Sequence, residues 1–281
     1  NFHPTESMSM ADRAGDLAGD LQHAGPLARG AALLRLLATA GRRGAALSTL
    51  AQATGLAAST THRLLGQLVA QRLAMQLDES RRYAIGPMAY ELGLAAAQQF
   101  DIRGLCRPAL EQLALEAGET AYLVLRSGDE AVCIDLAEGA SAVRVSTLQI
   151  GSRRPLGVGA GGLAVLAALP DDEAARILAR VADRVALEWQ FPAAALRRSV
   201  HDTRRRGQAL IRNRITPGVT ALGQAFHDSL GQVLGGVSVA GANARMTEPR
   251  LRALQGRAAQ AARAIEQALK GHQWARLVAP G

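Results

Sequence analysis

Aromatic residues are scarce in this chain of 281 residues, which has four Phe, two Trp and three Tyr. Proteins that bind single-stranded nucleic acid stack bases on aromatic side chains, so the scarcity argues against that class and leaves double-stranded nucleic acid open. Hydrophobic residues nevertheless make up 48% of the chain, so a core of Ala, Leu, Val and Ile is expected. At roughly 100 to 200 residues a domain, the length corresponds to about two domains.

Lysine and cysteine are almost absent. Lys270 is the single lysine, so 31 of the 32 basic residues are arginine, as biased codon usage in a GC-rich genome would produce. Cys106 and Cys133 are the only cysteines and no C-x-x-C motif occurs, which argues against a zinc site and predicts two buried thiols. The least polar run, 156–169, is too short to cross a membrane. The N-terminus has no apolar signal core, so the sequence predicts a cytoplasmic protein. We also expect no metal, no cofactor and no membrane partner.

The net charge of +8 is concentrated in one segment. Residues 27–86 carry eight arginines against Asp78 and Glu79, which amounts to +6 of the total. A compact basic segment is typical of proteins that bind the phosphate backbone, although a solvated arginine face has the same composition.

Three helices and a β-hairpin are predicted within this basic segment. Apolar spacing and turn residues place the first helix at 27–40, the second from an N-cap at Ser48 to Gly55, and the third at 58–71. The two strands of the hairpin are placed at 73–77 and 82–85. A helix-turn-helix needs a small residue where its helices touch, a glycine about four positions later, and apolar residues around a small core. These demands are met by Ala51, Gly55, Leu56 and Leu64.

DNA-contacting side chains are expected at the start of the third helix and in the hairpin, which forms a wing. These candidates are Ser59, Thr60, Thr61, His62, Arg63, Arg81 and Arg82. Thr61 occupies a position that normally turns inward and would bury its hydroxyl. A small helical bundle with an ordinary turn is the alternative interpretation.

A mixture of helices and strands follows a helix predicted at 88–100. The further helices are expected at 108–117, 163–168, 171–182, 193–206 and 248–269, and the strands at 121–125, 132–136, 209–213, 219–226 and 233–240, with alternation also around Val143, Val145 and Thr147. This order predicts an antiparallel sheet flanked by helices in an α+β domain. The domain prediction is a flexible lead-in (1–26), a winged helix-turn-helix (27–87), a linker helix (88–103), the α+β domain (104–272) and a tail (273–281).

A glycine-rich stretch formally contains G-x-G-x-x-G at 157–162. In a dinucleotide-binding unit this motif follows a buried parallel strand, whereas here it follows 153–155 and precedes predicted helices, which argues against a nucleotide site. We expect instead that backbone N–H groups of the loop, at a helix N-terminus, receive a small anion; a tightly packed loop is the alternative. No catalytic set emerges, because His201, His227 and His272 have no partner at a recognisable spacing.

The residues along most of the chain resemble those of IclR-type transcriptional regulators. The resemblance rests on 27–30, 50–56, 59–65 and 82–87 in the first part and on 118–120, 151–155, 217–219 and 236–241 in the second. It implies a non-enzymatic regulator in which an N-terminal winged helix-turn-helix domain is joined by a linker helix to a C-terminal GAF-like α+β effector-binding domain. It also implies a homodimer or a dimer of dimers, for which we expect pairing through helices 29–38 and 88–100 and an inverted-repeat operator.

This chain departs from the family at four places. Thr61 stands where the family usually has valine, the glycine-rich loop has no lysine, 212–214 is basic where many members have acids, and Ala221 replaces a cysteine found in some members. The identity of the effector is therefore not transferred from the resemblance.

The effector pocket is predicted from strand alternation, which puts Ala209, Ile211 and Asn213 on one face. The expected lining is Leu156, Ala160, Gly161, Ile211, Asn213, Ala221, Ser238 and Ala240. Such a pocket has apolar walls, an amide, a hydroxyl and no buried acid, which favours a small organic acid, aromatic acids included, as the signal for a catabolic operon. The alternative hypothesis is an enzyme that has a nucleotide- or acyl-binding C-terminal domain and uses the helix-turn-helix only for assembly.

Overall fold

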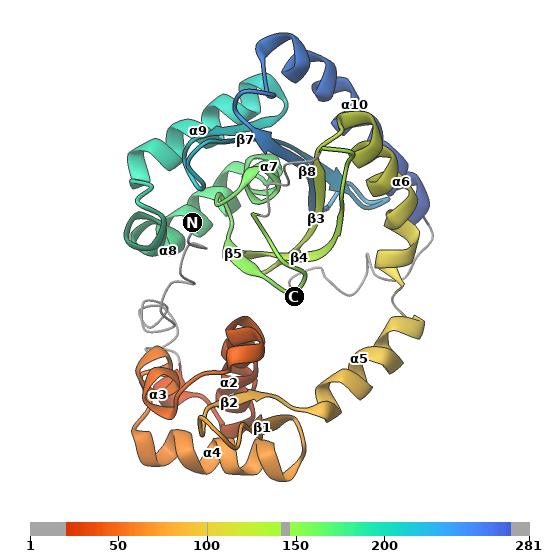
Figure 1. Cartoon of the computed structure of the whole chain (residues 1–281). Coiled ribbons are helices and arrows are strands. Elements are labelled where there is room, and N and C mark those ends of the chain that lie inside the picture. The colour runs from red at the N-terminus through yellow and green to blue at the C-terminus, as the bar shows by residue number, and fades with distance from the viewer. Residues whose placement is uncertain (1–20, 100, 142–146, 271–281) are drawn as a thin grey trace. The chain divides into compact units, whose positions relative to one another are not determined.

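The computed structural model describes residues 21–99, 101–141 and 147–270. The chain divides into two compact units between Gln99 and Phe100, each with its own core (Figure 1). No helix among the described residues is long and apolar enough to cross a membrane.

The N-terminal unit is a winged helix-turn-helix. Its elements are α2 (Pro26–Ala40), a short 3-10 turn (Gly41–Arg43), α3 (Leu47–Thr54), α4 (Ala58–Ala70), β1 (Ala74–Gln76), β2 (Tyr83–Ile85) and α5 (Pro87–Gln99). Leu33, Leu50 and Leu65, one from each of the first three helices, meet in a core that excludes water. This burial holds α3 and α4 at the fixed angle that a helix-turn-helix requires.

Gly55 makes the turn between α3 and α4. Its φ of 65° lies in the left-handed region that glycine adopts without strain, as the sequence predicts. The predicted N-cap at Ser48 is wrong, because α3 already begins at Leu47 after Ala46 and no side chain caps it. The β1–β2 hairpin is tied to the loop before α3 by paired backbone hydrogen bonds between Ala45 and Tyr83.

The C-terminal unit is built on an antiparallel sheet. Its elements are α6 (Ile102–Ala117), β3 (Thr120–Ser127), β4 (Glu130–Ala137), β5 (Arg153–Pro155), α7 (Ala160–Ala168), α8 (Asp171–Trp189), α9 (Ala193–Arg206), β6 (Ala209–Arg212), β7 (Val219–His227), β8 (Val233–Ala242) and α10 (Glu248–Leu269). Among the described residues, the six strands have the order β5-β4-β3-β8-β7-β6, and every neighbouring pair is antiparallel.

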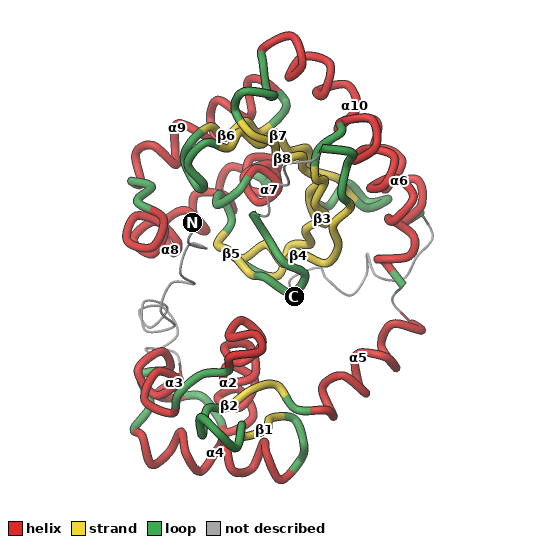
Figure 2. The backbone as a smooth tube through the Cα atoms, viewed as in Figure 1, coloured by secondary structure: helices red, strands yellow, loops and turns green. Residues whose placement is uncertain are grey.

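Helices cover both faces of this sheet. Figures 1 and 2 show α6 and α10 on one side and α7, backed by α8 and α9, on the other. Successive residues of β3 alternate between the two cores: Tyr122 and Val124 pack on the α7 side, and Leu123 and Leu125 on the α6 and α10 side. The central strand is therefore buried on both faces, which explains its nearly unbroken apolar sequence.

Several predicted boundaries in this unit are wrong. α6 begins at Ile102, before Pro108, because Asp101 caps it by accepting a hydrogen bond from the Gly104 N–H at 2.9 Å. α8 continues beyond residue 182 to Trp189, and the short strand β5 was not predicted. Of the alternating residues expected near 143–147, Val143 and Val145 lie outside the described residues, and Thr147 is not in a strand.

Candidate functional site

The first candidate site is the outer surface of α4. Ser59, His62 and Arg63 are exposed and Thr60 is partly exposed, because the helix buries Leu64 and Leu65 on its opposite face. These four side chains form a polar strip at the N-terminal end of the second helix of the motif. In a helix-turn-helix, this end of the recognition helix lies in the major groove of DNA.

Thr61, the fifth candidate on α4, does not face outward. Its side chain is fully buried, and its hydroxyl donates a hydrogen bond to the Ala57 carbonyl at 3.1 Å. Including Thr61 among the DNA-contacting residues is therefore wrong. A hydroxyl is tolerated at this core position because the preceding turn of the helix supplies an acceptor.

The wing presents two arginines with different surroundings. Arg81 is exposed at the hairpin turn, where its φ of 51° bends the backbone. Arg82 is also exposed, and its Nε donates to the Gly44 carbonyl at 3.1 Å, so part of its guanidinium fastens the wing to the loop before α3. Among the described residues no carboxylate forms an ion pair with Arg63, Arg81 or Arg82, which leaves their positive charges uncompensated.

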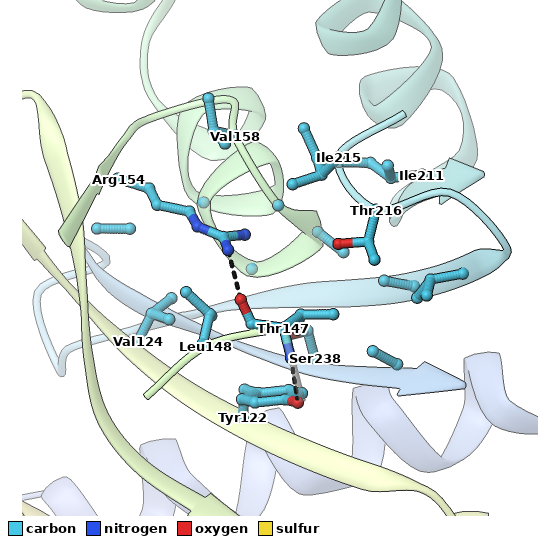
Figure 3. Close-up of a pocket in the computed structure, with 18 residues that line it drawn as sticks. Tyr122, Val124, Thr147, Leu148, Arg154, Val158, Ile211, Ile215, Thr216 and Ser238 are labelled. Carbon is cyan, nitrogen blue, oxygen red and sulfur yellow. Dashed lines mark hydrogen bonds between the residues drawn. The ribbon is translucent and has the colours of Figure 1, made fainter. Parts of the chain in front are cut away.

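The second candidate site is a pocket between the sheet and the N-terminus of α7. Its empty volume is about 600 Å³, which includes open solvent at its mouth. Six predicted residues line it: Ala160, Gly161, Ile211, Ala221, Ser238 and Ala240. Twelve further residues that line it were not predicted, among them Tyr122, Thr147, Leu148, Arg154, Ile215 and Thr216 (Figure 3).

Two of the predicted pocket residues lie elsewhere. Leu156 is fully buried in the core on the α7 side and does not line the pocket. Asn213 is exposed, because β6 ends at Arg212 and Asn213 has a φ of 52°, so the alternation of an extended strand no longer applies. Its side-chain oxygen accepts hydrogen bonds from the Gly218 N–H at 2.9 Å and from the Asn243 amide at 2.5 Å, which closes the turn between β6 and β7.

Glycines in the sheet set the position of the α7 N-terminus. A Cβ on Gly223 of β7 would lie 2.3 Å from the Ala160 carbonyl oxygen, and one on Gly236 of β8 would lie 2.6 Å from that of Gly161. Only residues without side chains allow the first turn of α7 to lie directly on the strands. The first turn of a helix also leaves N–H groups without partners inside the helix, so this end of α7 provides donors for an anion at the pocket.

Arg154 is the only charged residue among the described residues that line the pocket. It follows Arg153 on β5, and Figure 3 shows its guanidinium reaching over the pocket toward Thr147. Burial lowers the pKa of Arg154, while nearby Tyr122 and Cys133 act in the opposite direction. Strand alternation at 153–155, immediately before the glycine-rich loop, was the sequence signal that could have identified this residue.

The pocket lacks the groups that hydrolytic or metal-dependent catalysis needs. Its described lining contains no His, Cys, Asp or Glu, so the Ser238 hydroxyl has no base beside it. Nowhere in the described part of the chain do three or more His, Cys, Asp or Glu residues come together as a metal site. The predicted burial of both thiols is confirmed, and burial raises the pKa of Cys106 to about 12 and that of Cys133 to about 11.

Comparisons with known proteins agree with this two-part architecture. The family model described as the IclR helix-turn-helix domain matches residues 26–78, and the one described as the bacterial transcriptional regulator IclR C-terminal matches residues 94–267.

Similar curated proteins match most of the chain. The HTH-type transcriptional regulator KipR of Bacillus subtilis is 30% identical over 206 residues, which cover 73% of this chain and 82% of that protein. The transcriptional repressor IclR of Escherichia coli is 29% identical over 228 residues, covering 80% of this chain and 82% of the repressor.

Solved structures share the fold. An IclR-family transcriptional regulator from Brucella abortus superposes with a TM-score of 0.73 at 26% identity, covering 95% of this chain and 99% of that one. A regulator from Silicibacter sp. TM1040 superposes with a TM-score of 0.76 at 24% identity, covering 88% of this chain and 97% of that one.

Proposed function

Because the chain belongs to the IclR family of bacterial transcriptional regulators, we propose that it binds operator DNA through α4 and the wing and that a small organic acid in the α7 pocket changes this binding. The family consists of regulators, so the alternative hypothesis of an enzyme is rejected. We expect the regulated operon to be catabolic.

The polar strip on α4 is the observation that supports the DNA-binding mode. Ser59, Thr60 and His62 are short or planar hydrogen-bonding groups, which suit base edges in the major groove. Arg63 and Arg81 flank them as exposed cations without carboxylate partners among the described residues, which suits phosphate oxygens. In this proposal the phosphate contacts fix the position of α4 on the duplex and the α4 strip selects the sequence.

The composition of the pocket is the observation that supports an organic acid. Its walls are mostly apolar, its described lining has no carboxylate to repel an anion, and its floor is the N-terminus of α7. An IclR homologue from Microbacterium hydrocarbonoxydans was solved in complex with 4-hydroxybenzoate, and it shares this fold with a TM-score of 0.65 at 21% identity, over 87% of this chain and 99% of that one. That likeness of fold supports an aromatic acid as one candidate class.

A homo-oligomer is part of the proposal. Specific recognition by a small helix-turn-helix domain generally needs two half-sites, so a dimer or a dimer of dimers on an inverted repeat is expected. α5 offers a surface for pairing, because Tyr90, Leu92 and Leu94 are 69%, 56% and 52% exposed. Large apolar side chains exposed on one helix are typical of an interface.

Selection of DNA from a random-sequence library, followed by calorimetry with carboxylic acids and their amides, tests the two halves of this function. The proposal expects an inverted-repeat consensus and binding of acids in preference to amides. Sequence-independent DNA binding would contradict the first half, and equal binding of the two ligand series would contradict the second.

A further inference from the structure

Two neighbouring arginines on β5 point to opposite sides of the strand. Arg153 pairs with Glu130, at 2.7 Å, and with the Ser127 hydroxyl, at 2.8 Å. Arg154 turns toward the pocket, as strand alternation requires. The chain therefore places one arginine in a structural ion pair and the next in the ligand site.

Backbone and side-chain groups hold the Arg154 guanidinium over the pocket. Its Nη2 donates a hydrogen bond to the Thr147 carbonyl, and the Thr147 N–H donates to the Tyr122 hydroxyl at 3.1 Å (Figure 3). Tyr122 itself is almost completely buried in β3, so these two hydrogen bonds connect Arg154 to a rigid part of the sheet. These hydrogen bonds fix the direction in which the remaining N–H groups of the Arg154 guanidinium point.

The positive charge of Arg154 is not neutralised by the protein around it. Within the described part of the chain, no Asp or Glu forms an ion pair with Arg154, and its hydrogen bond to Thr147 uses one of five N–H donors. A guanidinium stays charged at neutral pH even where burial disfavours its charge. A partly buried cation with unused donors gains most from an anion that accepts two parallel hydrogen bonds, as a carboxylate does.

We infer that Arg154 is the residue that selects a carboxylate over a neutral ligand in this pocket, and that Tyr122 positions it through Thr147. The inference rests on the proposed function and adds a defined partner for the ligand's charge. The α7 N-terminus supplies only partial charge and backbone donors, whereas Arg154 supplies a full charge and a planar pair of donors. Loss of Arg154 should therefore abolish discrimination by charge without closing the pocket.

Isothermal titration calorimetry of the full chain tests this inference, with benzoate and 4-hydroxybenzoate as anionic probes and benzamide as the neutral probe. In the wild type both acids should bind more tightly than benzamide. In Arg154→Gln, affinity for the acids should fall about 10- to 100-fold, the usual range for a lost charged hydrogen bond, while benzamide affinity stays unchanged. Arg154→Lys keeps the charge without the planar fork and should show an intermediate loss.

Two more variants separate recognition from folding. Tyr122→Phe keeps the ring and removes the hydroxyl, so it should weaken binding of the acids severalfold and leave benzamide binding as it is; a merely structural role would affect both ligand classes equally. Arg197→Gln, at an exposed position on α9, is the matched control and should leave all affinities unchanged.

Two results would overturn the inference. If Arg154→Gln and Arg154→Lys both keep the wild-type preference for acids, the α7 N-terminus recognises the anion, and the proposed acid effector survives without Arg154. If the wild type binds none of the probes, or binds benzamide as well as the acids, the proposed ligand class fails and the role of Arg154 fails with it.

Discussion

Replacing Gly223 by alanine should displace the N-terminus of α7 from the sheet. The new Cβ would lie 2.3 Å from the carbonyl oxygen of Ala160 and 2.5 Å from its carbonyl carbon, closer than real Cβ contacts allow. Both clashing atoms belong to the backbone, so no rotamer change relieves the contact. Since the φ of Gly223 is not positive, alanine suits the strand conformation and the cost arises from the clash alone.

The expected loss of stability follows from the size of this clash. Overpacking a close-packed interior costs typically about 1 to 3 kcal/mol, and a clash with rigid backbone belongs at the upper end. Alanine recovers about 0.5 to 1 kcal/mol of the backbone entropy that glycine loses in a strand. We therefore expect Gly223→Ala to lower the free energy of unfolding by about 1 to 2.5 kcal/mol and to weaken acid binding, because the first turn of α7 is part of the pocket.

Urea unfolding followed by circular dichroism measures the change, with Gly256→Ala as the matched control. Gly256 lies on the exposed side of α10 with open space around it, so alanine there should stabilise the protein by up to about 1 kcal/mol through helix propensity. Equal stability and equal acid binding of Gly223→Ala and the wild type would refute the placement of α7 on β7.

Four further predictions follow from the same structure. Arg63→Ala and Arg81→Ala should each lower the slope of log affinity against log salt by about one in anisotropy titrations with operator DNA, and unchanged slopes would remove these residues from the phosphate contacts. Thr61→Val should leave DNA affinity unchanged and the free energy of unfolding within about 1 kcal/mol, because the lost hydroxyl is buried and the carbonyl it contacts also accepts the Thr61 N–H; a large loss of DNA affinity would place Thr61 on the DNA. Burial alone would raise the pKa of Glu130, but its two arginine partners outweigh burial and hold this pKa below the ordinary 4.5. The ionised carboxylate therefore stabilises the fold above about pH 4.5, and the difference in unfolding free energy between wild type and Glu130→Gln should shrink as the pH falls below that value; a difference independent of pH contradicts this. Leu92→Arg should shift the proposed homo-oligomer toward monomer in sedimentation experiments, whereas an oligomer unchanged by this substitution would place the interface away from α5.

Periodic patterns allowed most elements to be predicted. The bounds predicted for α9 and α10 agree with the structure, because both helices bury one apolar face over many turns and end at clear signals, such as Gly207 after α9. The helix-turn-helix was predicted for a similar reason, since a turn that needs a left-handed residue favours glycine, and Gly55 supplies it.

Tertiary contacts explain what the patterns missed. β5 is a strand of three residues, two of them arginines, and it exists because it pairs with β4. Asn213 was assigned to the pocket on the assumption that β6 continues, but the turn that follows takes it out of the strand. Arg154 was missed because the strand β5 was not itself predicted, so the alternation that turns one of two adjacent arginines toward the pocket could not be applied.

The most direct test of the central claim is fluorescence anisotropy of the full chain on a duplex from the random-sequence selection, with and without an acid that calorimetry shows to bind. At constant salt, the acid should change the affinity for this duplex by at least about fivefold, the lower end of typical coupling between two sites. Saturation of the pocket with no change in DNA affinity would contradict the account of the protein as an acid-responsive regulator.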